Sequence, residues 1–196
     1  MQYWSLSDPG CVRTQNQDAY QVEQLDRNTL LCVLCDGMGG AKSGNVASSL
    51  AVEVFTQVAA LIRGRDATII NVGDSRAYAI DRTGIRQLTK DHSLVQMMVE
   101  RGELTPERAR TYPGKNFITR AVGTESVLES DLFHYRLSRG DCLLLCSDGL
   151  SNMMDDQEIL FEVVHGVNKQ LCCQRLLDIA KSRGAPDNVT SILVQV

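Results

Sequence analysis

The sequence lacks a hydrophobic run long enough to cross a membrane. Its longest apolar stretch, Leu30 to Cys35, is far shorter than the roughly 20 residues that a spanning helix needs. Its first residues, MQYWSLSDPG, contain neither the basic region nor the apolar region of a secretory signal peptide. A net charge of −4 and the lack of a Lys/Arg cluster also argue against nucleic acid or an anionic membrane as the main partner.

An even set of cysteines, which a disulfide framework would need, is also absent. The chain has seven cysteines, and most of them lie inside apolar runs, which indicates reduced, buried thiols in a cytoplasmic protein. Cys32 and Cys35 have CxxC spacing, but residues i and i+3 of a strand point to opposite faces. We therefore expect no zinc or redox site there.

No internal repeat, low-complexity tract or linker divides the 196 residues, so we expect a single domain over residues 1–196. Apolar or β-branched runs predict strands at 30–35, 67–72, 76–80, 141–146 and 189–196, with weaker candidates at 20–23 and 132–137. Four-residue apolar spacing and N-cap residues predict helices over 44–57, 93–101, 105–110, 155–165 and 168–183. This mixture is typical of an α+β domain.

Three of the predicted strands end at an aspartate that glycine or serine follows. Asp36 ends LLCVLCD, Asp74 lies in NVGDSR, and Asp148 lies in LLLCSDGL. Two further acids, Asp18 in RTQNQD and Asp187 in GAPDN, lie in polar segments that we expect to be loops. A single Asp-Gly pair is common turn chemistry. However, strands can deliver their ends to one rim of a sheet, where converging carboxylates repel each other unless hard cations lie between them.

Carboxylate, carbonyl and water oxygens are ligands that suit Mg²⁺ or Mn²⁺, so we interpret the five acids as a metal cluster. Other motifs fail on spacing. A P-loop would need glycines where Ala41 and Asp36 stand, and a dinucleotide fingerprint that began at Gly37 would need a glycine at Lys42. The sequence also contains no calcium-binding loop, and its three histidines have no ligand-like spacing.

Seven segments occur in the order found in one protein family: GCVRTQNQDAY, LLCVLCDGMGG, NVGDSRAY, LTKDHSLVQMMVERGELT, FITRAVGT, LLLCSDGLSNM and GAPDNVTSILVQV. Together they resemble the metal-dependent protein phosphatases of the PPM family, also called type 2C, and most of all its compact bacterial members that oppose Ser/Thr protein kinases. The resemblance covers nearly the whole chain. It implies a four-layer αββα sandwich of two antiparallel β-sheets flanked by helices, with the metals at one end.

The resemblance also implies a role for each acid. Asp36 matches the ligand that bridges two Mn²⁺ or Mg²⁺ ions, and the Gly37 carbonyl matches a ligand of one of them. Asp148 and Asp187 match the residues that complete the shell of one ion. Asp18 matches a residue that acts on the other ion, directly or through waters.

Two further positions extend this site. Asp74 matches the family position linked to a third, weaker metal, to which Asp148 also contributes, and Arg13 matches the arginine that grips the substrate phosphate. The implied reaction is the hydrolysis of phosphoserine or phosphothreonine in proteins by a metal-activated water. Phosphate-monoester hydrolysis needs accelerations that approach ~10²¹-fold, which two metal ions and an arginine fork serve better than a single hydrogen-bond donor.

The chain departs from the family pattern in several places. Family members carry a second long helix and a Gly-Thr-Thr strand entry before ATIINVGDSR. Here FTQVAALIRGRD joins the predicted first helix directly to that strand, so we expect that a segment near residues 57–58 is missing from the sequence as given. A natural deletion there would remove part of a sheet and one layer of helix packing. Met38 stands where eukaryotic members have a histidine proposed as general acid, so water would protonate the leaving group. Bacterial relatives often have His, Glu and His where this chain has Ala41, Asn45 and Tyr112.

Two functions of different classes follow. The first is a Mn²⁺- or Mg²⁺-dependent Ser/Thr protein phosphatase, a cytoplasmic monomer that acts on phosphorylated proteins and on its partner kinase, with residues 91–123 as a flap beside the site. The alternative is a non-catalytic regulator that uses the same fold to bind a phosphoprotein or a kinase. Loss of Asp148 or Asp187 would favour the alternative. Because all five acids and Arg13 are present, the sequence favours the enzyme.

Overall fold

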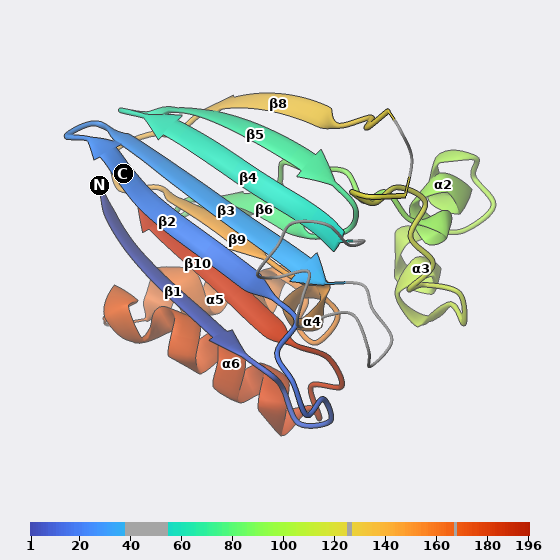
Figure 1. The fold of residues 1–196 in the computed structure, drawn as a ribbon. Coiled ribbons are helices and arrows are strands. Elements are labelled where there is room, and N and C mark those ends of the chain that lie inside the picture. Colours follow the sequence, from blue (N-terminus) through green and yellow to red (C-terminus); the bar gives the residue numbers. More distant parts are fainter. Residues whose placement is uncertain (38–54, 125–126, 167) are drawn as a thin grey trace.

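The computed structural model of the chain describes residues 1–37, 55–124, 127–166 and 168–196. Two antiparallel sheets of five strands each pack face to face (Figure 1). We call them sheet A, with the strand order β1-β10-β9-β6-β7, and sheet B, with the order β2-β3-β4-β5-β8. The predicted α+β sandwich of two antiparallel sheets with helices is therefore confirmed.

The strands of each sheet come from distant parts of the chain. Sheet A contains β1 (Gln2–Asp8), β6 (Arg76–Ile80), β7 (Ile85–Gln87), β9 (Cys142–Cys146) and β10 (Val189–Gln195). Sheet B contains β2 (Ala19–Asp26), β3 (Thr29–Gly37), β4 (Phe55–Arg63), β5 (Asp66–Val72) and β8 (Asp131–Arg136). The strands predicted from apolar runs are all present, and β1, β4 and β7 are additional to them.

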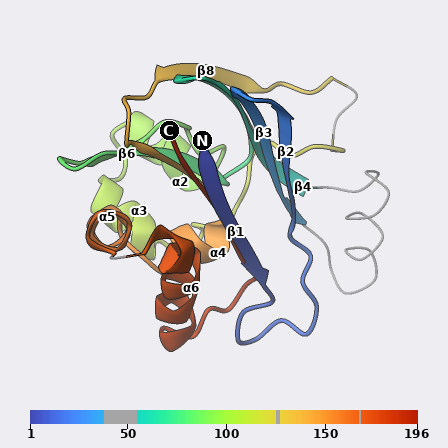
Figure 2. The ribbon, with the colours of Figure 1, turned by 90° about the vertical axis from the view of Figure 1, so that its left-hand side faces the viewer.

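Helices cover the outer face of sheet A and one end of the molecule. Figure 2 shows the helices α4 (Asp148–Ser151), α5 (Asp156–His165) and α6 (Cys172–Ser182) on that face, with the 3₁₀ turn η1 (Lys169–Leu171) before α6. The flap carries α2 (Leu94–Glu100) and α3 (Pro106–Thr111). Side chains that the sequence marks as N-caps bond the first turns: Ser93 in α2, Thr105 in α3 and Asp155 in α5. Among the described residues, no helix is both long and apolar enough to cross a membrane.

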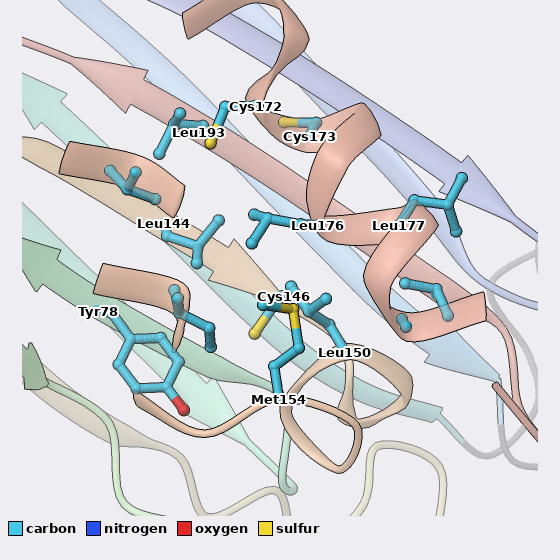
Figure 3. Close-up of a cluster of buried hydrophobic side chains, with 14 of the residues drawn as sticks. Tyr78, Leu144, Cys146, Leu150, Met154, Cys172, Cys173, Leu176, Leu177 and Leu193 are labelled. Atoms are coloured by element: carbon cyan, nitrogen blue, oxygen red, sulfur yellow. The ribbon is translucent and has the colours of Figure 1, made fainter. Parts of the chain in front are cut away.

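Strand β9 is apolar at every position because both of its faces are covered. Leu143 and Leu145 point into the core between the two sheets, whereas Leu144 and Cys146 point into a core beneath the helices. Figure 3 shows this second core, in which Leu144 lies near Tyr78, Leu150 and Leu176. The two cores fix β9 from both sides, and therefore fix the position where it ends, at Ser147 and Asp148.

The junction near residues 57–58 is the interior of a strand. Of the helix predicted over 44–57, residues 44–54 lie outside the described residues. For residues 55–57 the helix prediction is wrong, because they belong to β4. These residues pair with Gly37 to Cys35 of β3, and Thr56 is buried. Pairing along all nine residues of β4 with β3 decides the conformation here, so both described sheets are complete across this junction.

The seven cysteines are all free thiols, as the sequence predicts. Five of them are buried, Cys35 is half-buried and Cys11 is exposed. Burial raises the pKa of the Cys32 thiol to about 12, and repulsion by two nearby aspartates adds to burial in raising that of Cys35 to about 11. Thiols with such pKa values remain protonated and unreactive.

Candidate active site

The five predicted aspartates lie at one end of the sandwich, where strands of both sheets end. Asp36 is near the end of β3, Asp148 opens α4 after β9, and Asp74 lies in the turn between β5 and β6. Asp187 comes shortly before β10, and Asp18 comes directly before β2. The other four carboxylates all repel that of Asp36, which shows that the strand ends and the two loops converge.

Burial and mutual repulsion raise the pKa of several of these carboxyl groups. Burial, followed by repulsion from Asp18 and Asp148, raises the pKa of Asp36 well above its usual range. Burial raises the pKa of Asp18 to about 6 and that of Asp74 to about 7. Burial also raises the pKa of Asp148, with repulsion from Asp187 as the next cause. A nearby cation would favour the ionised form of all these groups, so the electrostatics fits a metal cluster.

The donor atoms also fit a hard cation. The Oδ1 atom of Asp74 is buried and has no hydrogen-bond partner, which leaves it available to a metal ion. Within the described ranges, no three acidic, histidine or cysteine side chains are arranged to hold an ion by themselves. Water molecules and the Gly37 carbonyl would therefore have to complete the shell, which is usual for Mg²⁺. Such a set of oxygen donors fits Mg²⁺ or Mn²⁺.

Hydrogen bonds orient three of the acids. The Thr190 hydroxyl donates to Asp18 Oδ2 at 2.6 Å, and the Asn152 amide donates to Asp148 Oδ2 at 3.0 Å. The backbone N–H of Asn188 donates to Oδ1 of its neighbour, Asp187, at 2.9 Å. Bonds of this kind to charged oxygens are short and strong, so they hold the carboxylates in one orientation.

Arg13 lies beside the acids, as predicted. Its Nη2 atom donates to Asp187 Oδ2 at 2.9 Å, and half of the side chain is exposed. The hydrogen bond and the charge of Asp187 raise the pKa of Arg13, and Asp148 and Asp36 add to the effect. The guanidinium therefore lies at the open side of the acid cluster, where it could turn to an incoming anion.

Glycine is required at two positions because backbones approach closely there. A Cβ on Gly37 would lie 2.7 Å from the Gln17 carbonyl oxygen, and a Cβ on Gly149 would overlap the backbone of Asn188. Gly37 therefore lets the loop before β2 lie against the end of β3, and Gly149 lets α4 lie against the loop before β10. This explains why glycines follow Asp36 and Asp148.

Comparison with known proteins gives a consistent result. A family model described as protein phosphatase 2C matches residues 12–62. Serine/threonine phosphatase stp of Listeria monocytogenes is 32% identical over 238 positions, which cover 96% of this chain and 93% of that protein. Protein phosphatase PhpP of Streptococcus pneumoniae is 33% identical, with 97% and 96% covered. The chain belongs to the protein phosphatase 2C family.

Solved structures of this family have the same fold. The crystal structure of serine/threonine phosphatase Stp1 from Staphylococcus aureus superimposes with a TM-score of 0.93 and 34% identity, covering 99% of this chain and 94% of that one. The catalytic domain of PstP in complex with two manganese ions gives a TM-score of 0.84 with 30% identity, covering 99% and 97%. The alignment with stp is longer than the 196 residues of this chain, so stp has internal residues that this chain lacks. The location of that gap near residues 57–58 stays a prediction.

The flap of this phosphatase 2C chain is tied to sheet A by a partly buried ion pair. Arg76 of β6 donates to both carboxylate oxygens of Asp91, the shortest contact being 2.7 Å, and to the hydroxyl of Tyr78 at 3.0 Å. A groove of about 840 Å³ lies between the flap and the α4–α5 corner, with Asp74 and Asp148 among its lining residues. The groove therefore leads from the acid cluster along the flap.

The structure brings together every predicted site residue and adds some that the sequence analysis missed. Thr190, Asn152 and Asn188 bond the acids, and Ser147 bonds the N–H of Thr190 through its hydroxyl oxygen. These residues lie within a few positions of Asp148 or Asp187 in the two motifs. Closeness to these two aspartates in the sequence was the only sign of their role. Which acid each side chain bonds depends on how β9 pairs with β10, and this pairing cannot be seen in the sequence.

Proposed function

We propose that this chain is a Mn²⁺- or Mg²⁺-dependent phosphatase that hydrolyses phosphoserine and phosphothreonine in proteins. The observation that supports it most is the convergence of five aspartates from both sheets beside one arginine, since five carboxylates in one place repel one another unless cations or protons neutralise them. Two such ions, when bound, acidify a water molecule and neutralise phosphate charge.

The proposal assigns the metal-binding roles to residues that the structure brings together. Asp36 lies at the centre of the cluster and would contact both ions, with the Gly37 carbonyl on one of them. Asp148 and Asp187 would hold one ion and Asp18 the other. Asp74, with its unpartnered buried oxygen, would hold a third ion together with Asp148. The solved complex of PstP with two manganese ions supports metal binding by this family.

Arg13 would bind the substrate phosphate. Its guanidinium carries parallel N–H donors that match two phosphate oxygens, and it lies within reach of the acid cluster. The neighbouring carboxylates repel a free phosphate, so the arginine charge is what makes this edge of the site attractive to an anion. Met38, Ala41 and Asn45 lie outside the described residues, so the proton donor to the leaving group remains the predicted water.

The partners follow from the reaction. Phosphorylated proteins would be the substrates, and a Ser/Thr protein kinase would supply them. That the protein is monomeric and cytoplasmic remains a prediction from the sequence. The alternative of a non-catalytic regulator gains no support, because all five acids and Arg13 are in place at one site.

Hydrolysis of p-nitrophenyl phosphate tests the proposal. We expect turnover with Mn²⁺, its loss in EDTA and its return when metal is added back. Asp148→Ala should bind Mn²⁺ more weakly in calorimetry and lose nearly all turnover, while its circular dichroism spectrum stays that of the wild type. Asp66→Ala, a change of an exposed aspartate at the start of β5, is the matched control and should keep full activity. Activity that survives EDTA, or a fully active Asp148→Ala variant, would refute the proposal.

A further inference from the structure

Asn188 has a side chain that is almost completely buried, with 4% of its surface exposed, and it follows Asp187 directly. Its Nδ2 group donates to the carbonyl oxygens of Pro9 and Gln15, each at 3.0 Å. Its Oδ1 atom accepts the backbone N–H of Gln17 at 2.8 Å. One amide therefore makes three hydrogen bonds to the backbone of a single segment, the loop over residues 9–17.

These three bonds lie on both sides of Arg13 in the sequence. Pro9 precedes the arginine, whereas Gln15 and Gln17 follow it, and the loop between them has no helix or strand. One more bond between backbones, from Cys11 N to the Ala185 carbonyl at 2.9 Å, holds the first half of the loop. The Asn188 amide thus fixes the two ends of the segment that presents the half-exposed guanidinium to the acid cluster.

The metal-ligand candidates next to this loop are held in other ways. The backbone of Asn188, and not its side chain, bonds Asp187. The Asp18 carboxylate is held by the Thr190 hydroxyl. The Asp18 backbone is held by the β2–β3 pairing that begins at Ala19 and by Asn16 of the loop, whose Oδ1 atom accepts the Asp18 N–H at 3.2 Å. No hydrogen bond joins the Asn188 side chain to either carboxylate, although Arg13 of the loop contacts Asp187. Removal of the Asn188 amide would therefore loosen the loop over residues 9–17, which we call the arginine loop, more than it would move the carboxylates.

We propose that Asn188 is a positioning residue for the phosphate-binding arginine, distinct from the residues that hold the metal. This inference rests on the proposed function, since it assigns to Arg13 the binding of the substrate phosphate. It separates two properties of one site: the side chain of Asn188 sets the affinity for phosphate, and the hydroxyl of Thr190 sets the affinity for metal.

The test compares Asn188→Ala with Arg13→Gln and with the matched variant Thr190→Val, all loaded with Mn²⁺. In Asn188→Ala we expect KM for a phosphopeptide and the inhibition constant of inorganic phosphate to rise about tenfold, the effect of losing roughly one charge-assisted hydrogen bond. The Mn²⁺ affinity in calorimetry should change less than about twofold, because the side chain of Asn188 bonds the loop backbone and none of the carboxylates. Thr190→Val should show the reverse pattern.

A second readout follows the loop itself. Amide hydrogen exchange over residues 9–17 should accelerate in Asn188→Ala, with or without Mn²⁺, and remain unchanged in Thr190→Val. In the Arg13→Gln background, Asn188→Ala should add no further loss of phosphate affinity, because the residue it positions is absent. If Asn188→Ala does not fold, Asn188→Ser, which keeps a polar group in the pocket, replaces it in the same measurements.

The outcomes that overturn the inference are an unchanged phosphate constant or a Mn²⁺ affinity that falls as much as the phosphate affinity. The second result would show that Asn188 supports the whole site and not the arginine loop. A wild-type protein that binds Mn²⁺ but hydrolyses no phosphoester would refute the proposed function alone. The phosphate binding constant and the amide exchange would then still decide the role of Asn188.

Discussion

Removal of metal should make the stability of this protein fall as the pH rises. The cause is the acid cluster, in which burial raises the pKa of Asp18 from 3.8 to about 6 and that of Asp74 from 3.8 to about 7. Between pH ~4 and pH ~7 the folded state therefore binds more protons than the unfolded state. Linkage then requires the free energy of unfolding to decrease with increasing pH across this window, and to be level above it.

The magnitude follows from the two shifts. One pKa unit corresponds to ~1.4 kcal/mol, so Asp18 alone would cost about 3 kcal/mol at pH 8 and Asp74 alone about 4 kcal/mol. The two costs do not add, because the aspartates share their repulsion with Asp148. Only the part of each shift that lies above pH 5 counts between pH 5 and pH 8, which is ~1.4 kcal/mol for Asp18 and ~2.7 kcal/mol for Asp74. We therefore expect a loss of about 3 kcal/mol, and no more than about 4 kcal/mol, over this range, against the ~5–15 kcal/mol that stabilises a typical domain.

Urea unfolding in EDTA at pH 5, 6, 7 and 8 measures this slope, and Mn²⁺ should abolish it at the upper end. Asp74→Asn removes one buried charge, so its metal-free form should be the more stable one at pH 8 and should show a flatter profile. Glu158, whose pKa Arg183 lowers to about 2, loses its contribution only below pH ~4 and does not affect this window. A metal-free wild type that is as stable at pH 8 as at pH 5 would refute the reasoning.

Three further predictions concern the scaffold of the site. Leu144→Ala opens a cavity beneath the helices and should cost ~2–5 kcal/mol in urea unfolding, against ~0.5 kcal/mol or less for the exposed Leu128→Ala. Gly149→Ala places a Cβ on the Asn188 backbone and should cost on the order of 3 kcal/mol or more in the same assay; a wild-type midpoint would contradict it. Arg76→Met leaves Gln87 as the remaining side-chain partner of Asp91 and should cost ~1.5–3 kcal/mol and expose the flap to proteolysis, and an equally protected flap would disprove the anchor.

The sequence was sufficient to locate the acids because the signals around them are local. An apolar run that covers both faces of a strand and stops at Asp36 or Asp148 predicts both the strand and its end, whatever the strand pairs with. Glycine after each of these acids marks the close approach of another backbone. The turn at Asp74 follows the same logic, and all three acids lie where this predicted them.

Local patterns failed where pairing between distant strands decides the structure. Residues 55–57 continue a helical spacing in the sequence, yet they form the first part of β4 because β3 offers them a complete antiparallel partner. Strand β1 contains polar and apolar residues without clear alternation, and its pairing with all of β10 from the other end of the chain makes it a strand. In both cases the backbone hydrogen bonds to a neighbouring strand outweigh the conformational preference of the local sequence.

The sequence by itself determined which residues are the candidates for the chemistry: five carboxylates and one arginine, in motifs that resemble one family. Only the tertiary structure decided how they are held. Asn188 reaches Pro9 and Gln15 across more than 170 positions of the chain, and Thr190 reaches Asp18 in the same way, because β10 pairs with β1 and places the end of the chain against its beginning. Contacts of such separation leave no periodic trace in the sequence, so they become visible only when the sheets are assembled.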